Sequence, residues 1–206
     1  MAVLVALSSA TAGVAFWKIT QARNHPQQAA LIVLPESRVL ADFSLVDQQS
    51  QAFTLTGLQD HWSLIFFGFT HCPDVCPTAL YEMQQVRKTI SKEVSDKRPQ
   101  PQFVFVSVDP ERDSPEKLRQ YLSHFDPDFI GLTGEHDQLL PLTRQMGIAY
   151  RVQEHEAGDL SYGVDHSAGI LLINPEGRLH GVFPAPHQSA KISDDLLDVI
   201  DDWGDS

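Results

Sequence analysis

The two cysteines of the chain, Cys72 and Cys76, lie in the segment FTHCPDVCP at residues 69–77. An apolar run precedes this segment, and a helix is expected from Pro77, so backbone N–H groups and the helix dipole can stabilise a thiolate and lower its pKa. Residues four apart share a helix face, which lets both thiols point to one side. Such a pair can oxidise to a disulfide or hold a soft metal ion such as Cu(I). The alternative, two cysteines buried as small hydrophobic side chains, suits the flanking Pro, Asp and His less well.

A dithiol alone does not separate redox chemistry from metal binding, so a third ligand decides between them. His166 is the favoured ligand because it lies just before an expected buried strand at residues 169–173, where it can face the loop that carries the cysteines. His71 is the second choice, since adjacent side chains point apart in extended chain. Asp165 is expected to hydrogen-bond a loop rather than to orient the His166 imidazole. The chain has nine histidines in all: His25, His61, His71, His124, His136, His155, His166, His180 and His187.

Composition narrows the class of protein. With 27 acidic against 15 basic side chains the formal net charge is −12, which argues against a surface that binds nucleic acid, because that needs clustered Lys and Arg. Two cysteines exclude a disulfide-rich scaffold and any site with four cysteine ligands. A length of 206 residues and a hydrophobic fraction of 42% fit one ordinary domain with a real core.

The rest of the sequence alternates strand and helix patterns. A small β-hairpin is predicted at residues 43–55, followed by buried strands and amphipathic helices. Ser114 and Pro115 form a helix start, with serine as the N-cap. This alternation predicts a three-layer α/β domain. Strands are expected at residues 64–69, 103–108, 129–132, 169–173 and 179–183, and helices at residues 77–94, from 115, 137–146 and 193–203.

The amino-terminal residues form a separate unit. Residues 2–17 carry no charged side chain, although a comfortable helical span needs about 20 residues. We interpret residues 1–20 as a short membrane anchor or a cleaved export signal, residues 21–38 as a tether and residues 39–206 as the folded domain. Both interpretations of the first segment place the domain across a membrane. The expected location is the periplasmic side of a bacterial inner membrane, or the equivalent intermembrane-space side.

Several separated blocks resemble the Sco/SenC family of thioredoxin-like copper proteins. They are FGFTHCPDVCP at 67–77, VSVDPERDSP at 106–115, GLTG at 131–134, VDHS at 164–167 and INPEG at 173–177. The resemblance implies a thioredoxin-like three-layer α/β/α domain with an added N-terminal hairpin and a membrane anchor. It also implies one copper ion per chain, as Cu(I), Cu(II) or both, with Cys72, Cys76 and His166 as its ligands.

The family's role implies a function and partners. The protein would be a copper chaperone that helps assemble the CuA centre of cytochrome c oxidase, so the expected partner is subunit II of that enzyme or another periplasmic or intermembrane copper protein. A thiol reductant is a second expected partner, because exported thiols meet an oxidising compartment. A chaperone of this kind is not expected to be an enzyme, and thiol–disulfide reductase activity is the alternative that would make it one.

Other functions use the same side chains. In a thiol–disulfide oxidoreductase Cys72 would attack a target disulfide, Cys76 would resolve the mixed disulfide, and His166 would be dispensable. A peroxidase of the peroxiredoxin type would have Thr three residues before its reactive cysteine, where this chain has Phe69. Zinc could bind the same three side chains, because ligand type alone does not exclude it.

Overall fold

A computed structural model describes residues 30–94, 99–156 and 158–204. Within them, eight strands form one mixed sheet in the order β1-β10-β9-β4-β5-β6-β2-β3, and β7 and β8 form a separate pair. The strands are β1 (Ile32–Val39), β2 (Ser44–Asp47), β3 (Ala52–Thr54), β4 (Ser63–Gly68), β5 (Gln102–Ser107), β6 (Ile130–Thr133), β7 (Tyr150–Val152), β8 (Val164–His166), β9 (Ile170–Ile173) and β10 (Arg178–Phe183).

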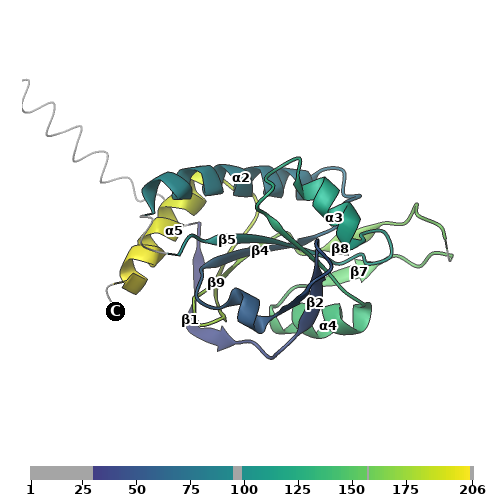
Figure 1. The fold of residues 1–206 in the computed structure, drawn as a ribbon, viewed down its shortest axis with the longest axis horizontal. Helices are drawn as coiled ribbons and strands as arrows, with labels where there is room; N and C mark the ends of the chain where they lie inside the picture. The colour runs from purple at the N-terminus through teal and green to yellow at the C-terminus, as the bar shows by residue number, and fades with distance from the viewer. Residues whose placement is uncertain (1–29, 95–98, 157, 205–206) are drawn as a thin grey trace, which may run out of the picture.

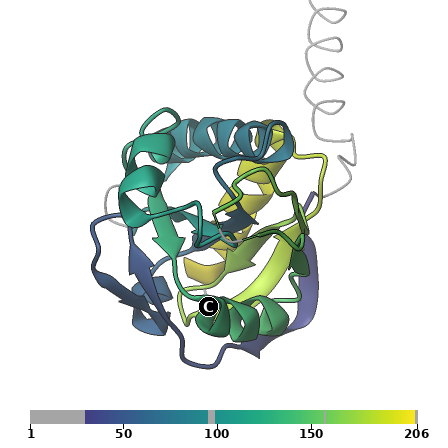
Figure 2. The ribbon, with the colours of Figure 1, turned by 90° about the vertical axis from the view of Figure 1, so that its right-hand side faces the viewer.

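Helices cover both faces of this sheet. Figures 1 and 2 show α2 on one side of it and α4 on the other, which confirms the predicted thioredoxin-like three-layer α/β fold. The helices are η1 (Leu55–Leu58, a 3₁₀ turn), α2 (Val75–Glu93), α3 (Pro115–Leu122), α4 (His136–Gln145) and α5 (Ser189–Gly204).

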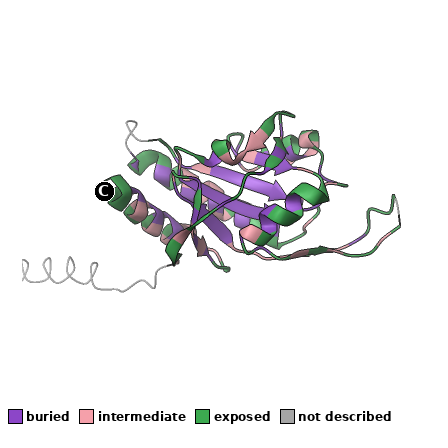
Figure 3. Ribbon diagram, turned by 90° about the horizontal axis from the view of Figure 1, so that it is seen from below, coloured by how far each residue is buried: buried purple, intermediate pink, exposed green. Residues whose placement is uncertain are grey.

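The two central strands are buried along almost their whole length. Every residue of β4 is buried, as is all of β5 after its first residue, and Figure 3 shows this buried band through the middle of the sheet. In a strand that is covered on both faces, the side chains on both faces are buried and therefore apolar. This explains the continuous apolar runs of the sequence. Phe66 of β4 pairs with Phe105 in the parallel strand β5 and with Ile170 in the antiparallel strand β9.

The predicted hairpin is confirmed as β2 and β3. Its turn is closed by the Asp47 carboxylate, which accepts hydrogen bonds from the backbone N–H groups of Gln49 and Gln51, each at 2.8 Å. Asp is favoured in such turns because its side chain can bond the backbone two residues on. The hairpin extends the sheet through pairing of Val46 with Thr133 of β6.

The structure has a strand at residues 32–39, which include the last part of the expected tether at residues 21–38. These residues form β1, which pairs antiparallel with β10 and has an irregular register between Val33 and Arg38. Pro35 lies in this strand, and proline is tolerated at a sheet edge because its missing N–H is not needed there. The expected anchor at residues 1–20 lies outside the described residues. Among the described helices, none is long and apolar enough to cross a membrane.

Helix starts were the least accurately predicted boundaries. Helix α2 begins at Val75 rather than Pro77, so Cys76 lies in its first turn. Helix α5 begins at Ser189, before the expected position 193. The short strands β7 and β8 were not predicted, whereas the end of α4 before Gly147 was, and this glycine has the positive φ of 72° typical of a helix end.

The predicted cap of α3 is confirmed, because the Ser114 side chain accepts a hydrogen bond from the Lys117 backbone N–H at 3.2 Å. We expect Ser114→Ala to lower the free energy of unfolding by about 1 kcal/mol, since an orphan donor at the helix start loses its acceptor. Urea denaturation measures this. Ser91→Ala, at an exposed position in the last turn of α2, is the control and should not destabilise the protein. Equal midpoints for both variants would contradict the assignment.

Candidate metal site

Three separate segments bring Cys72, Cys76 and His166 together. Cys72 lies in the loop after β4, Cys76 in the first turn of α2 and His166 at the end of β8. One ligand atom from each, the two Sγ atoms and an imidazole nitrogen, lie within 4.8 Å of one another. Cys76 Sγ lies 3.4 Å from His166 Nε2. Within the described part of the chain, this is the one cluster of three such side chains close enough for a metal ion.

His71, the second choice, lies outside this cluster. Its ring is exposed and lies 3.2 Å from the Lys117 Nζ atom through Nε2. Burial and the nearby Lys117 charge lower the pKa of His71. The side chain of Asp165 forms an exposed ion pair with Arg151 of β7 at 3.4 Å, so its observed partner is on a neighbouring strand and not in a loop as predicted.

The two cysteines differ in exposure. Cys72 is partly exposed, whereas Cys76 is fully buried. The Cys76 backbone N–H points to Cys72 Sγ at 3.4 Å, which places this sulfur at the positive end of the α2 dipole. The backbone N–H of Cys72 itself donates to the Phe69 carbonyl at 3.3 Å. The Cys72 sulfur is therefore the accessible one, at the start of α2, and the Cys76 sulfur is enclosed by the protein.

Burial controls the acidity of Cys76. Desolvation raises the pKa of this thiol, and the backbone hydrogen bond from Phe69 only partly opposes the increase. The expectation that the helix start would lower a thiol pKa is wrong for Cys76, because removal from water penalises the thiolate more than the dipole favours it. A cation held by the same side chains would supply the missing stabilisation.

The tautomer of His166 follows from its hydrogen bond. Its Nδ1 lies 2.9 Å from the Ser167 carbonyl oxygen, and because a carbonyl only accepts, Nδ1 carries the hydrogen. The neutral ring then has its lone pair on Nε2, the atom that faces Cys76. Metal-binding histidines typically use the second ring nitrogen in this way. The rings of Phe66 and Phe69 pack edge-on against the imidazole, each with a centroid distance of 5.8 Å.

Gly68 makes room for the buried sulfur. A Cβ atom at this position would lie 2.7 Å from Cys76 Sγ and 2.9 Å from the Phe105 ring. Both distances are far below ordinary van der Waals contact, so any side chain here would displace the sulfur. The glycine of the FGFTHC segment is thus required by the close approach of α2 to the end of β4.

Asp113 fixes the cysteine loop, and no role was predicted for it from the sequence. Its buried carboxylate accepts hydrogen bonds from the Thr70 backbone N–H at 2.8 Å, the Thr70 hydroxyl at 2.5 Å and the Ser107 hydroxyl at 2.6 Å. The signal was present as an aspartate in the VSVDPERDSP block, but sequence alone does not say which loop it faces.

A thioredoxin-like domain with a Cys–Cys–His cluster at the start of its first long helix defines a class of dithiol protein that can bind a soft metal. The family model described as SCO1/SenC matches residues 34–201. The chain therefore belongs to the SCO1/SenC family.

Individual relatives support membership of the SCO1/SenC family. An SCO2-like protein of Rickettsia conorii is 39% identical over 141 residues, which cover 68% of this chain and 67% of that one. The mitochondrial SCO2 homolog of Homo sapiens is 36% identical over 155 residues, 75% of this chain and 57% of that protein. Among solved structures, copper-bound ScoI of Arabidopsis thaliana matches with a TM-score of 0.70 at 31% identity, covering 79% of this chain and 98% of that one.

The different exposure of the two thiols predicts different reactivity. We expect iodoacetamide at pH 8 to modify Cys72 at least about tenfold faster than Cys76, because the thiolate is the reacting species and burial both raises the Cys76 pKa and blocks access. Mass spectrometry of Cys72→Ser and Cys76→Ser variants of the metal-free reduced protein measures the two rates separately. Equal rates would contradict the enclosed position of Cys76.

Proposed function

We propose that this protein is a copper chaperone whose cargo binds to Cys72, Cys76 and His166, one ion per chain. The observation that carries the proposal is the convergence of two sulfurs and the Nε2 lone pair within 4.8 Å. Thiolate and imidazole ligands suit Cu(I), whereas Mg²⁺ and Ca²⁺ prefer oxygen ligands. The same set can accept Zn²⁺, and the copper-bound relative among the solved structures favours copper.

A site with three protein ligands suits transfer of a metal ion better than its permanent storage. A closed site with four protein ligands holds its ion structurally, whereas an open position admits an incoming ligand. Because Cys72 is partly exposed, a thiolate of an acceptor protein can approach the ion from that side. The ion then passes by ligand exchange, in which each new bond to the acceptor replaces one to this chain.

The acceptor we propose is the CuA site of cytochrome c oxidase, in subunit II, as the family resemblance implies. We also propose that residues 1–20 attach the domain to a membrane, on its periplasmic or intermembrane-space side; the human relative is mitochondrial by name.

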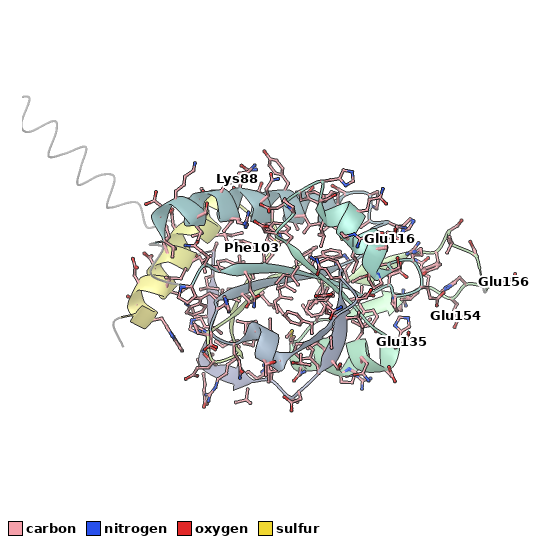
Figure 4. The ribbon with its side chains drawn as sticks, viewed as in Figure 1. Lys88, Phe103, Glu116, Glu135, Glu154 and Glu156 are labelled. Carbon is pink, nitrogen blue, oxygen red and sulfur yellow. The ribbon has the colours of Figure 1, made fainter. Side chains whose placement is uncertain are left out.

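Figure 4 shows Glu116, Glu135, Glu154 and Glu156 at the end of the molecule where β7 and β8 lie. Negative charge at this end of the molecule attracts cations and basic surfaces at low salt.

Copper stoichiometry of the reduced full chain tests this function. We expect about one Cu(I) per wild-type chain, loss of tight binding in Cys72→Ser and Cys76→Ser, and at least about tenfold weaker binding in His166→Ala. Affinity should fall as pH falls, since protons compete for the thiolates. Competition with a chromophoric Cu(I) chelator measures each affinity.

His71→Ala is the matched control, because His71 is adjacent to Cys72 but lies outside the cluster. It should bind copper as the wild type does. Retained tight binding in both serine variants would refute the copper site, and a loss in His71→Ala equal to that in His166→Ala would refute the choice of ligand.

A second function is favoured by the exposure of the sulfurs. Cys72 is accessible at a helix start and Cys76 is buried within 4.8 Å of it, which is the arrangement of an attacking and a resolving thiol. As a thiol–disulfide oxidoreductase, the Cys72 thiolate would attack a target disulfide and release one target thiolate. Cys76 would then displace the second, leaving a reduced target and a Cys72–Cys76 disulfide that a separate dithiol reductant must reduce.

A trapping experiment tests this second function. We expect Cys76→Ser to accumulate a mixed disulfide between Cys72 and a disulfide-bonded peptide, because the resolving thiol is absent, and His166→Ala to reduce the peptide at the wild-type rate. Non-reducing mass spectrometry detects the trapped species, with Cys72→Ser as the control that should form none. If Cys76→Ser forms no adduct, reductase activity is excluded.

A further inference from the structure

Arg112 is a buried cation next to the metal site that has no role in the chemistry described above. Its side chain is 3% exposed, and its Nε forms an ion pair with the Asp109 carboxylate, which is 1% exposed. A buried arginine is costly unless its charge is paired; Asp109 supplies the paired charge here, while Nη2 of Arg112 is buried without a hydrogen-bond partner in the described part of the chain. Its remaining contacts therefore show which parts of the structure it joins.

One set of contacts reaches the segment that leads into β8. Arg112 Nη1 donates to the Leu160 carbonyl at 3.1 Å and to the Tyr162 carbonyl at 2.9 Å. The guanidinium carbon also lies 3.7 Å from the centre of the Tyr162 ring, and the Tyr162 hydroxyl donates to Asp109 at 2.6 Å. His166 follows Tyr162 within the same segment, at the end of β8.

A second contact reaches the cysteine loop. The guanidinium carbon lies 5.5 Å from the centre of the Phe69 ring, a cation–π distance. Phe69 in turn accepts the Cys72 backbone N–H through its carbonyl and packs its ring against the His166 imidazole. Arg112 thus touches the segments that carry the cysteines and the histidine at the same time.

We infer that Arg112 is a positioning residue that holds His166 at metal-binding distance from Cys72 and Cys76. Strand β8 pairs with β7 and not with the main sheet. The pairing of β4 with β9 brings the two segments to one edge of the sheet, and the contacts of Arg112 join them there. Nη1 of Arg112 donates to both carbonyls. The guanidinium also lies over the Tyr162 ring and at cation–π distance from the Phe69 ring, and lysine cannot reproduce this geometry. The inference rests on the proposed copper site and concerns its third ligand alone.

A double-mutant cycle on the reduced full chain tests this inference. The four proteins are the wild type, Arg112→Lys, His166→Ala and the double variant, with Cu(I) affinity measured by chelator competition. We expect Arg112→Lys to weaken binding about tenfold when His166 is present and to have no further effect in the His166→Ala background. Such non-additivity is the signature of two residues that act through one interaction.

A spectroscopic readout separates positioning from general loosening of the structure. X-ray absorption at the copper edge of the loaded protein should show two sulfur ligands and one imidazole nitrogen in the wild type. Arg112→Lys should keep the sulfurs and lose the nitrogen. An imidazole retained in Arg112→Lys, or affinity losses that add in the double variant, would overturn the inference.

Two further variants complete the comparison. Arg87→Lys is the matched control, because Arg87 also pairs with carboxylates, including Asp126 at 2.6 Å. None of its ion pairs in the described part of the chain is with the cluster. The copper affinity of this variant should equal that of the wild type. Tyr162→Leu removes the stacked ring and the hydroxyl that donates to Asp109, with Asp109 and Arg112 themselves unchanged, so it serves in the same cycle if Arg112→Lys does not fold. Absence of copper binding by the wild type would overturn the proposed function, and additive losses with normal wild-type binding would overturn only the role of Arg112.

Discussion

The enclosure of the Cys76 thiol against the His166 imidazole is the constraint on which the site depends. A fully buried thiol resists ionisation, and desolvation raises its pKa. The neighbouring Nε2 lone pair, 3.4 Å away, can accept a hydrogen bond from the S–H group, but a neutral imidazole supplies no positive charge to stabilise a thiolate. The cluster is therefore best satisfied by a ligand that is cationic, soft and small enough to lie between the three atoms. In the absence of such a ligand, the S–H···N contact keeps the same atoms together.

The topology of the sheet explains why these residues meet. Strands β4 and β9 are antiparallel neighbours, and Phe66 near the end of β4 pairs with Ile170 at the start of β9. The chain that leaves β4 and the chain that enters β9 therefore lie at the same edge of the sheet. The first carries the cysteines and the second carries His166, so residues 90 positions apart in sequence reach hydrogen-bonding distance. The parallel neighbour β5 ends at this edge too, which brings Asp113 to the cysteine loop.

The meeting of strand ends at one edge of the sheet also explains which parts of the site could be predicted from the sequence. The buried strands and the choice of His166 followed from apolar runs and from the rule that strand ends meet at one edge, and the structure places His166 at that edge. The sequence did not indicate β1, because Pro35 and a register irregularity hide its pattern, nor β8, which is only three residues long. The roles of Asp113 and Arg112 depend on contacts between segments that lie far apart in the chain. Local patterns carry no information about such contacts.

The same two sulfurs serve both proposed functions, and the two functions exclude each other at any instant. A Cys72–Cys76 disulfide has no thiolate to offer copper, and a bound copper ion occupies the thiolates that would attack a target. His166 distinguishes the two states, because its Nε2 can be a metal ligand but has no required part in disulfide exchange. The hydrogen bond from His166 to the Ser167 carbonyl directs the Nε2 lone pair to the buried sulfur. This orientation suits metal binding. The position of the histidine therefore supports the proposed copper site, and the redox state of the two sulfurs determines when copper can bind there.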